Sequence, residues 1–247
     1  MKTYNLFALI AFFVAACGST EKKADDTAED TPAVEESAQL TEAQKQEGWK
    51  LLFDGKSLDG WRTYKNAEST HWDVADGTIH CNASENSDLQ ADLITVDEFE
   101  NFELAFDWKI SSGGNSGVMF RVSEEKDRPY FTGPEYQLLD DANYAGEVEE
   151  INFTASNYDM HAPENKKMMP VGEWNTSKIV ANGPHIEHWL NGAKVLEYEI
   201  GSDDWKKRKE ASKWKEMESY AKPTKGHVDL QDHGHEIWFR NIMIREL

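Results

Sequence analysis

The chain has 247 residues, of which 39% are hydrophobic and 11% aromatic, enough apolar material for one well-packed core. Acidic residues outnumber basic ones by 46 to 26, which gives a formal charge of −20 at pH 7. This charge argues against a nucleic-acid partner, because phosphate binding needs a cationic surface. With only two cysteines, the chain is neither a disulfide scaffold nor a cysteine-rich zinc protein.

The N-terminal segment predicts export and a lipid anchor. A lysine at position 2 precedes an apolar run from Leu6 to Ala16, which has signal-peptide length and is too short to span a bilayer. Small residues then lead directly to Cys17, and this arrangement resembles a bacterial lipobox. We therefore expect residues 1–17 to be a lipoprotein signal, Cys17 to carry the lipid, and the protein to lie in the bacterial cell envelope with this anchor as its only membrane contact. In the alternative, an ordinary secretory signal, Cys17 has no role.

Residues 18–47 predict a solvated, acidic tether. They contain no aromatic residue and too little apolar surface to offset the entropy that ordering would cost. The chain shows no internal repeat and no second linker, so we expect one folded domain over residues 48–247. The second cysteine, Cys81, is expected to be a small buried residue of a strand.

Alternation of apolar and polar residues dominates the body of the chain and predicts β-strands. Turns rich in Gly, Asn and Asp separate many short strands, which indicates an antiparallel sandwich or barrel. Asn191-Gly192 predicts a tight hairpin turn. Residues 203–220 break the pattern and predict a short helix in a late connection over one edge of the sandwich. The predicted strands include residues 103–109, 118–123, 135–138, 186–190, 193–198 and 228–231.

Three successive predicted strands direct their apolar side chains to one face, so polar side chains gather on the other. Side chains two residues apart share a face, and neighbouring strands lie about 5 Å apart, so these groups form one patch if the strands are adjacent. A solvated sheet face is the alternative for each residue alone, whereas the group suits the floor of a sugar-binding site. The patch would contain Asp107, Lys109, Met119, Arg121, Glu135 and Gln137.

A series of motifs along residues 49–247 resembles the family called domain of unknown function 1080, described as the 3-keto-disaccharide hydrolase domain. Each motif is weak alone, but seven occur in the family's order. Ser212-Lys213-Trp214 departs mildly from the Ser-Lys-Phe that is typical of the family. The matching stretches are 52–61, 114–121, 135–140, 172–175, 188–192, 226–234 and 239–242.

The resemblance implies a concanavalin A-like jelly roll, all-β, whose two antiparallel sheets offer one concave face to carbohydrate. It also implies action on small glycosides in which the glucose C3 hydroxyl has been oxidised to a ketone. Such a ketone acidifies the C2 proton, so a base can remove that proton and the C1 substituent can leave; hydration of the enone completes a net hydrolysis. This route needs a base near C2, a donor to the ketone oxygen and an acid for the leaving group. Arg, Lys or a divalent metal ion could hold the enolate.

Glu135, His233 and Arg121 are the predicted catalytic residues. Glu135 is the first choice for general base or acid, and His233 is the best histidine because imidazole titrates near neutral pH. Arg121 is expected to pair with Glu135 across strands or to bind substrate oxygens. A purely structural role is the alternative for each. The predicted substrate-binding residues are Asp107, Lys109, Asn115, Gln137, His188, Lys213 and Gln231.

We assign no cofactor and no metal, because the Asp and His residues near the C-terminus match no standard zinc signature. The chain has no nucleophile elbow, phosphate loop or dinucleotide fingerprint, which argues against a serine hydrolase, an NTPase and an oxidoreductase. Two other functions stay open. One is a non-catalytic carbohydrate-binding module of a cell-envelope glycan-utilisation system, and the other is an ordinary glycosidase with two carboxylates about 5 Å or about 6.5–9.5 Å apart.

Overall fold

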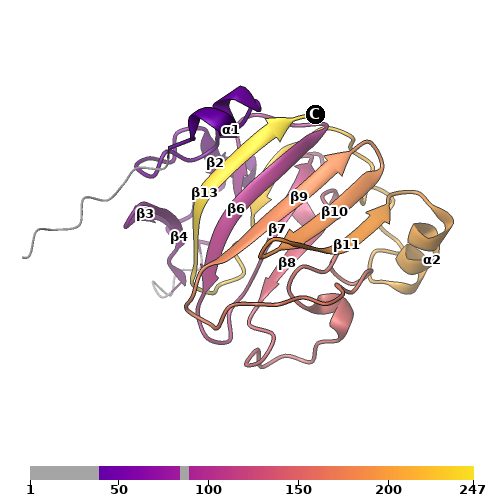
Figure 1. Ribbon diagram of the computed structural model, residues 1–247. Coiled ribbons are helices and arrows are strands. Elements are labelled where there is room, and N and C mark those ends of the chain that lie inside the picture. Colours follow the sequence, from indigo (N-terminus) through magenta and orange to yellow (C-terminus); the bar gives the residue numbers. More distant parts are fainter. Residues whose placement is uncertain (1–38, 84–88) are drawn as a thin grey trace, which may run out of the picture. The chain divides into compact units, whose positions relative to one another are not determined.

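Two antiparallel β-sheets form the body of the protein in the computed structural model, which describes residues 39–83 and 89–247 (Figure 1). The large sheet consists of β1 (Lys50–Leu51), β3 (Trp72–Ala75), β4 (Thr78–Cys81), β6 (Phe102–Ile110), β9 (Asn175–Asn182), β10 (His185–Leu190), β11 (Ala193–Glu199) and β13 (Ile237–Glu246). The small sheet consists of β2 (Trp61–Thr63), β5 (Leu93–Thr95), β7 (Asn115–Val122), β8 (Glu135–Leu139) and β12 (His227–Leu230). The predicted all-β sandwich of two antiparallel sheets is confirmed.

The strand order brings distant parts of the sequence together. In the large sheet the order is β11-β10-β9-β6-β13-β4-β3, with β1 paired to β13. In the small sheet it is β2-β5-β12-β7-β8. Strand β12, near the C-terminus, therefore lies between β5 and β7, and its Asp229 pairs with Ile94 of β5 and Met119 of β7.

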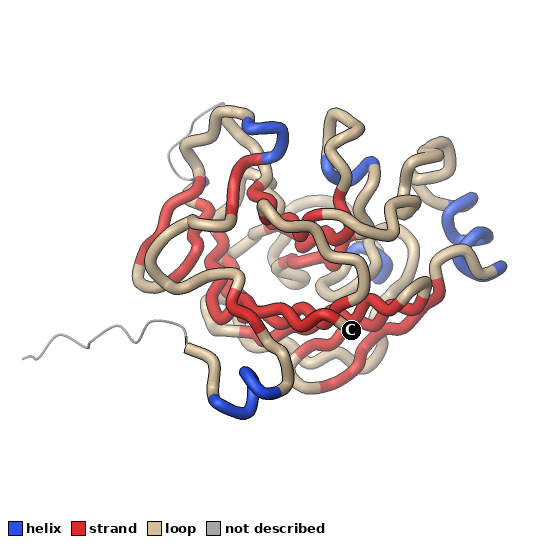
Figure 2. Tube along the Cα trace, turned by 90° about the horizontal axis from the view of Figure 1, so that it is seen from above, coloured by secondary structure: helices blue, strands red, loops and turns tan. Residues whose placement is uncertain are grey.

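Alternating apolar side chains of both sheets make the core between the two layers of strands that Figure 2 shows. On β6 every second residue is buried, and Phe106 packs edge-on against Tyr136 of β8 with ring centroids 5.9 Å apart. The Tyr136 hydroxyl lies 2.9 Å from Ser177 Oγ of β9, so the polar atom of this buried ring has a partner. This packing turns Glu135 and Gln137, the neighbours of Tyr136, to the other face of the small sheet.

The predicted hairpin across Asn191-Gly192 joins β10 to β11. Asn191 has a φ of 48° and Gly192 a φ of 82°. A two-residue turn that follows the twist of the strands needs positive φ at both positions, and Asn and Gly are the residues that tolerate it best. The sequence signal for this turn is confirmed.

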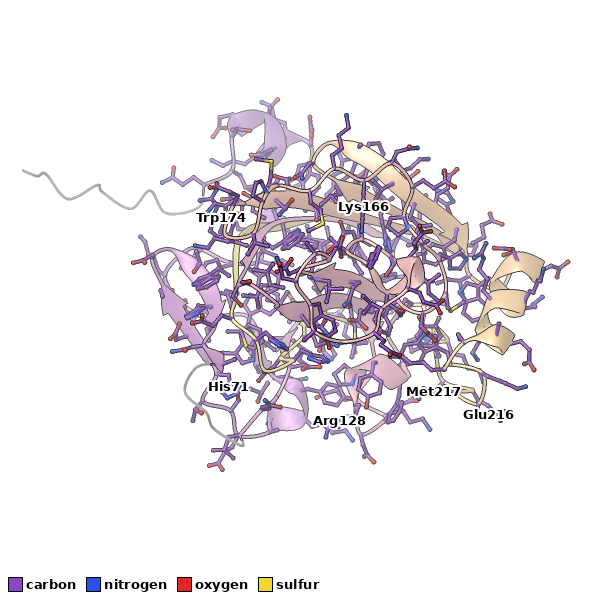
Figure 3. All side chains as sticks on the ribbon, turned by 90° about the horizontal axis from the view of Figure 1, so that it is seen from below. His71, Arg128, Lys166, Trp174, Glu216 and Met217 are labelled. Atoms are coloured by element: carbon purple, nitrogen blue, oxygen red, sulfur yellow. The ribbon has the colours of Figure 1, made fainter. Side chains whose placement is uncertain are left out.

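Helix α2 (Asp203–Ala211) lies in the connection between β11 and β12, as predicted. Ser202 caps its N-terminus, because Ser202 Oγ accepts a hydrogen bond from the Trp205 N–H. The helix ends at Ala211, and the rest of the predicted helical segment forms turns, in which Figure 3 labels Glu216 and Met217. The short 3₁₀ helices of the described chain are η1 (Tyr64–Asn66), η3 (Pro129–Phe131) and η4 (Glu150–Asn152).

Helix α1 (Glu42–Gln46) falls within the segment predicted to be a tether. Thr41 and Gln44 form a capping box, each side chain accepting from the other's backbone N–H. Gln44 Nε2 lies 3.5 Å from Met243 Sδ, so the helix contacts β13 of the large sheet. Cys17 and most of the predicted tether lie outside the described residues. Within residues 39–83 and 89–247, no helix is long and apolar enough to cross a membrane.

Strand β7 contains a β-bulge next to Arg121. Met119 pairs with Asp229 and Val122 pairs with His227, so β7 has one residue more than β12 between the two pairs. Arg121 itself has a positive φ of 52°. The extra residue shifts the alternation, and Val122 packs in the same apolar cluster as Met119.

The bulge moves Arg121 away from the predicted patch. Its Nε donates to the Glu100 carbonyl at 2.9 Å, and its Nη1 donates to the Gly183 carbonyl at 2.8 Å. These bonds tie β7 to the loop before β6 and to the turn between β9 and β10. The predicted pairing of Arg121 with Glu135 is therefore wrong, because period-two alternation does not continue through a bulge.

We predict that Arg121→Met destabilises the fold. The buried guanidinium makes charge-assisted hydrogen bonds to two carbonyls, and their loss should lower the free energy of unfolding by about 2–4 kcal/mol. Urea unfolding measures the change, with Lys206→Met on the exposed surface of α2 as a control that should stay within about 0.5 kcal/mol. Equal stability of the Arg121 variant and wild type would contradict this role.

Candidate functional site

A pocket of about 240 Å³ opens on the face of the small sheet that points away from the core. Strands β7 and β8 supply its floor, and four connections supply its rim. Six of its eight lining residues were predicted from the sequence. The pocket is lined by Asn115, Tyr130, Glu135, Gln137, Tyr158, Lys213, Gln231 and His233.

Glu135 lies at the centre of this group and is only 4% exposed. Glu135 pairs with Met119 of β7, and its carboxyl group lies over Gly117 of the same strand. A Cβ atom added to Gly117 would come within 2.9 Å of Glu135 Cδ. The absence of a side chain at Gly117 thus makes the space that the carboxyl group fills. The Gln137 side chain lies 2.9 Å from Glu135 Oε1 and donates to it when its amide nitrogen faces the carboxylate.

Burial raises the pKa of Glu135 to about 7, because the ionised form loses its hydration. The positive charge of Lys213 acts in the opposite direction and lowers this pKa, while the negative charge of Asp92 raises it further. A carboxyl group that titrates near neutral pH can both take and give a proton under physiological conditions. Glu135 is therefore suited to acid/base chemistry in a way that a surface glutamate is not.

Lys213 reaches the pocket from the turns after α2 and is held there by aromatic rings. Its Nζ lies 4.0 Å from the centroid of the Tyr158 ring and 4.4 Å from that of Trp214. The backbone N–H of Lys213 also donates to Asp159 Oδ2 at 2.7 Å. These contacts place an ammonium group beside the Glu135 carboxyl, where it can stabilise negative charge on a bound ligand.

His233 and Asn115 form the other side of the pocket. His233 Nε2 lies 3.4 Å from Asn115 Nδ2, and the His233 ring stacks on His235 with centroids 5.7 Å apart. Asn115 Oδ1 accepts from Gln137 Nε2 at 2.9 Å when the Gln137 amide takes the other orientation. The amides and the imidazole offer the donors and acceptors that sugar hydroxyls need, and imidazole can also transfer a proton.

Asp229 is a buried acid beside the pocket that the sequence reasoning missed. It faces Met119 across β12 and β7, in the same row as Glu135, and is 0% exposed. Burial, with the nearby charges of Asp92 and Glu135, raises its pKa well above the ordinary value. Neither carboxylate oxygen of Asp229 has a hydrogen-bond partner among the described residues. Burial therefore favours the protonated form of Asp229. Its alternation with Val228 and Leu230 was the available sequence signal.

Asp107 and Lys109 lie on the outer face of the large sheet, not in the pocket. Lys109 Nζ lies over the Trp238 ring at 4.5 Å, and Asp107 accepts hydrogen bonds from Thr176 and Asn241. Their predicted place in the binding floor is wrong. Alternation identified the polar face of β6, but β6 and β7 belong to different sheets.

His188 is a core residue of β10 and does not reach the pocket. It is 0% exposed, and its Nδ1 lies 3.0 Å from the Ala155 carbonyl, to which it donates in the matching tautomer. Burial lowers its pKa to about 4, so the ring stays neutral. Its predicted role in substrate binding does not agree with this position. The structure therefore brings together Glu135, His233, Asn115, Gln137, Gln231 and Lys213, and separates Arg121, Asp107, Lys109 and His188 from them.

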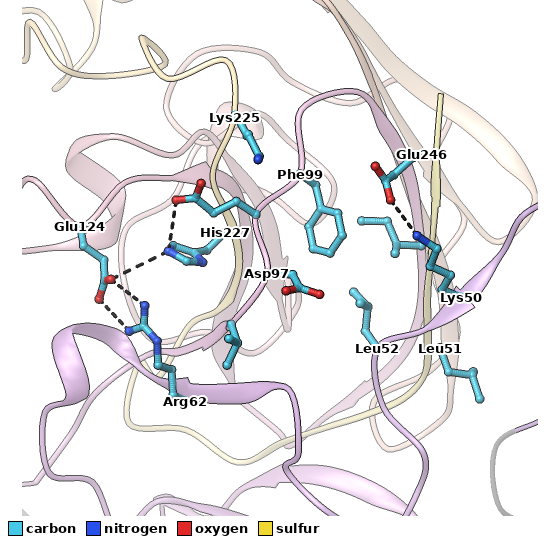
Figure 4. Close-up of a pocket in the computed structure, with 13 residues that line it drawn as sticks. Lys50, Leu51, Leu52, Arg62, Asp97, Phe99, Glu124, Lys225, His227 and Glu246 are labelled. Carbon is cyan, nitrogen blue, oxygen red and sulfur yellow. Dashed lines mark hydrogen bonds and ion pairs between the residues drawn. The ribbon is translucent and has the colours of Figure 1, made fainter.

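A larger cavity, of about 650 Å³, contains none of the predicted site residues (Figure 4). Its charged side chains are largely paired with one another: Arg62 donates to both oxygens of Glu124, and Lys50 lies 2.9 Å from Glu246. Size alone therefore does not identify the functional site. The smaller pocket has the perturbed carboxyl group and the convergent polar side chains.

We predict that Glu135 makes the stability of the protein depend on pH. In the window from about pH 4.5 to about pH 7 the folded state keeps a proton that the unfolded state loses, so stability is full below this window and falls as pH rises through it. Glu135→Gln should remove up to about 3 kcal/mol of this fall. Urea unfolding of both proteins at pH 5 and pH 8 measures it, and parallel losses in variant and wild type would contradict the raised pKa.

Comparison with known proteins identifies the family. The chain matches the model of the 3-keto-alpha-glucoside-1,2-lyase-like domain over residues 48–245. A relative from Bacteroides thetaiotaomicron, named 3-keto-disaccharide hydrolase, is 32% identical over 99% of this chain and 98% of that protein.

Two crystal structures of Parabacteroides distasonis proteins, both assigned provisionally to the glycosyl hydrolases, share the fold. The first has a TM-score of 0.79 and 39% identity, covering 86% of this chain and 100% of the other. The second has a TM-score of 0.63 and 32% identity, covering 81% and 99%. These matches extend over nearly the whole folded body and support a function in glycoside hydrolysis. The chain belongs to the 3-keto-alpha-glucoside-1,2-lyase-like domain family.

Proposed function

We propose that this protein cleaves the glycosidic bond of small 3-keto-glycosides by acid/base chemistry next to the C3 ketone. The observation that carries the proposal is the buried carboxyl of Glu135, whose pKa burial raises to about 7, beside the ammonium group of Lys213. The name of the Bacteroides relative, 3-keto-disaccharide hydrolase, supports the substrate class.

In the proposed reaction, Glu135 in its ionised form takes the C2 proton. The electron pair of the C–H bond moves to give an enolate, whose negative charge lies on the former ketone oxygen. Lys213 is the nearby cation that can stabilise this charge. A base with a pKa near 7 suits this step, because it is ionised in about half of the molecules at neutral pH and still accepts a proton strongly.

The enolate then expels the C1 substituent with its bonding pair, and the proton held by the newly protonated Glu135 neutralises the leaving oxygen. Burial lowers the pKa of His233, so His233 serves this step as a hydrogen-bonding group. A C1–C2 double bond conjugated with the ketone results. Addition of water returns a hydroxyl to C1 and a proton to C2, so the net change is hydrolysis. Asn115, Gln137 and Gln231 supply hydrogen bonds that can hold the ring hydroxyls during these steps.

A non-catalytic sugar-binding module would need the amides of this pocket but not a buried carboxyl that titrates near pH 7. Burial of the ionised Glu135 carboxylate lowers the free energy of unfolding, and a role in proton transfer would explain why the protein tolerates this loss. The lipid anchor at Cys17, and with it the cell-envelope location, stays a prediction from the sequence because Cys17 lies outside the described residues.

We predict that the purified protein releases the aglycone from 3-keto-glucosides and that the rate depends on Glu135 and Lys213. Glu135→Gln should lower kcat/KM by about 10²- to 10⁴-fold. In the wild type, kcat/KM should rise with pH through about 7, as Glu135 ionises. Lys213→Met should also lower kcat/KM, whereas Lys109→Met, the same change on the outer face of the other sheet, should not. Absence of release from any 3-keto-glucoside, or equal losses in the two lysine variants, would contradict the proposal.

We predict that Gly117→Ala acts through Glu135. The added methyl group would occupy the space of the Glu135 carboxyl and displace it, which should lower kcat/KM at least about 10-fold. The double variant Gly117→Ala/Glu135→Gln should be no slower than Glu135→Gln alone, since the carboxylate that acts as the base is already absent. Kinetics of the three variants give the comparison, and multiplicative losses would show that Gly117 acts independently of Glu135.

A further inference from the structure

Outside the pocket, His71, Cys81 and Asp232 bring three kinds of metal-ligating atom together. His71, labelled in Figure 3, directly precedes β3; Cys81 ends β4; and Asp232 follows β12. The first two come from the β3–β4 hairpin of the large sheet and the third from the end of a strand in the small sheet. The cluster therefore links the two layers of the sandwich.

The ligand atoms of this cluster lie close enough to share one ion. Cys81 Sγ lies 3.6 Å from Asp232 Oδ1, His71 Nδ1 lies 2.9 Å from Asp232 Oδ2, and one ligand atom of each residue lies within 4.8 Å of the others. Around a tetrahedral zinc ion, with Zn–N and Zn–O near 2.0–2.1 Å and Zn–S near 2.3 Å, neighbouring ligand atoms are about 3.3–3.6 Å apart. The separation of Cys81 Sγ from Asp232 Oδ1 already fits, whereas His71 Nδ1 faces the other oxygen, Oδ2, and has to move before one ion can contact all three side chains.

Burial and charge also suit a divalent ion. The His71 side chain is 1% exposed, the Asp232 side chain 0%, and Cys81 0%. A thiolate and a carboxylate together carry two negative charges, so a divalent cation makes the buried group neutral overall, and imidazole adds a neutral ligand. Nitrogen, sulfur and oxygen ligands in one site are typical of zinc rather than of calcium or magnesium, which prefer oxygen.

We propose that His71, Cys81 and Asp232 bind one zinc-type divalent ion, which takes no part in the bond changes of the proposed reaction. Binding forms the bond from Cys81 Sγ to the metal and releases the thiol proton to solvent. The three side chains leave one tetrahedral position for water. Without metal, Asp232 Oδ1 accepts hydrogen bonds from Cys81 Sγ and the Gly234 N–H, and Asp232 Oδ2 lies 2.9 Å from His71 Nδ1. The competing description is therefore a metal-free polar cluster.

The ion would fix one wall of the pocket. Asp232 stands between Gln231 and His233, both of which line the pocket, and its own N–H donates to Asp92 Oδ1 at 2.9 Å. A metal bond to Asp232 would join this segment to the β3–β4 hairpin more firmly than hydrogen bonds do. His71, Cys81 and Asp232 are thus ligands of a structural site beside the pocket.

The test is metal content of the full chain. The protein is stripped with a chelator, incubated with zinc, passed over a desalting column and analysed for bound metal. Wild type should keep one zinc per chain. Loss of an outer-shell partner lowers metal affinity by about 10–100-fold, and Cys81→Ala and His71→Gln should lower the zinc affinity by more than that. His185→Gln is the matched control, because His185, Glu187 and Glu197 form a second, more exposed cluster of potential ligands, and this variant should keep its zinc.

Circular dichroism shows whether each ligand variant folds. If a variant does not fold, cobalt substitution of the wild type tests the site without any change to its ligands. Cobalt bound by Cys81 gives a thiolate-to-metal charge-transfer band in the near ultraviolet. The band should persist in Cys17→Ser, which removes the other cysteine of the chain. Zinc that is lost from His185→Gln but kept by Cys81→Ala would overturn the proposal. So would a wild-type protein that retains no zinc, or a cobalt spectrum without the sulfur band.

Discussion

The burial of one carboxyl group, that of Glu135, is the constraint on which the chemistry of this protein depends. A carboxylate removed from water strongly prefers its neutral form, and only nearby donors and cations reverse that preference. Here Lys213 offsets part of the penalty, so the pKa settles near 7 rather than far above it. Gly117 makes the burial sterically feasible, because any side chain there would occupy the carboxyl's place.

Different parts of the sandwich contribute different features of this environment. The interior packing of Tyr136 and its neighbours fixes the pleat of β8, and the pleat directs Glu135 outwards. The small sheet then supplies the floor, while Tyr130, Tyr158 and Lys213 come from connections that line the rim of the pocket. A rigid sheet with a rim of loops is a common way to hold catalytic groups in place.

Alternation in the sequence was enough to predict the sandwich and the shared face of Glu135 and Gln137, because side-chain direction along a strand depends only on the pleat. It could not predict which sheet each strand joins. Asp107 and Lys109 were therefore predicted in the binding floor, although they lie on the outer face of the large sheet. Arg121 was misplaced because one inserted residue reverses the faces that follow it. Tyr130 lies in a single 3₁₀ turn and Tyr158 in a loop, and neither segment is long enough to show a periodic signal. Asp229 gave no distinct signal, because a buried acid alternates with apolar residues in the same way as an exposed polar residue does.

The most direct test of the central claim is a titration of the Glu135 carboxyl itself. Carbon-13 NMR of protein labelled in its glutamate carboxyl groups, with the Glu135 signal assigned by its loss in a Glu135→Gln sample, reports the protonation of this one group. We expect a midpoint near pH 7. A midpoint near the ordinary glutamate value of about 4.5 would contradict the claim, because an ionised and unperturbed carboxylate would leave this pocket a polar surface without special acid/base capacity.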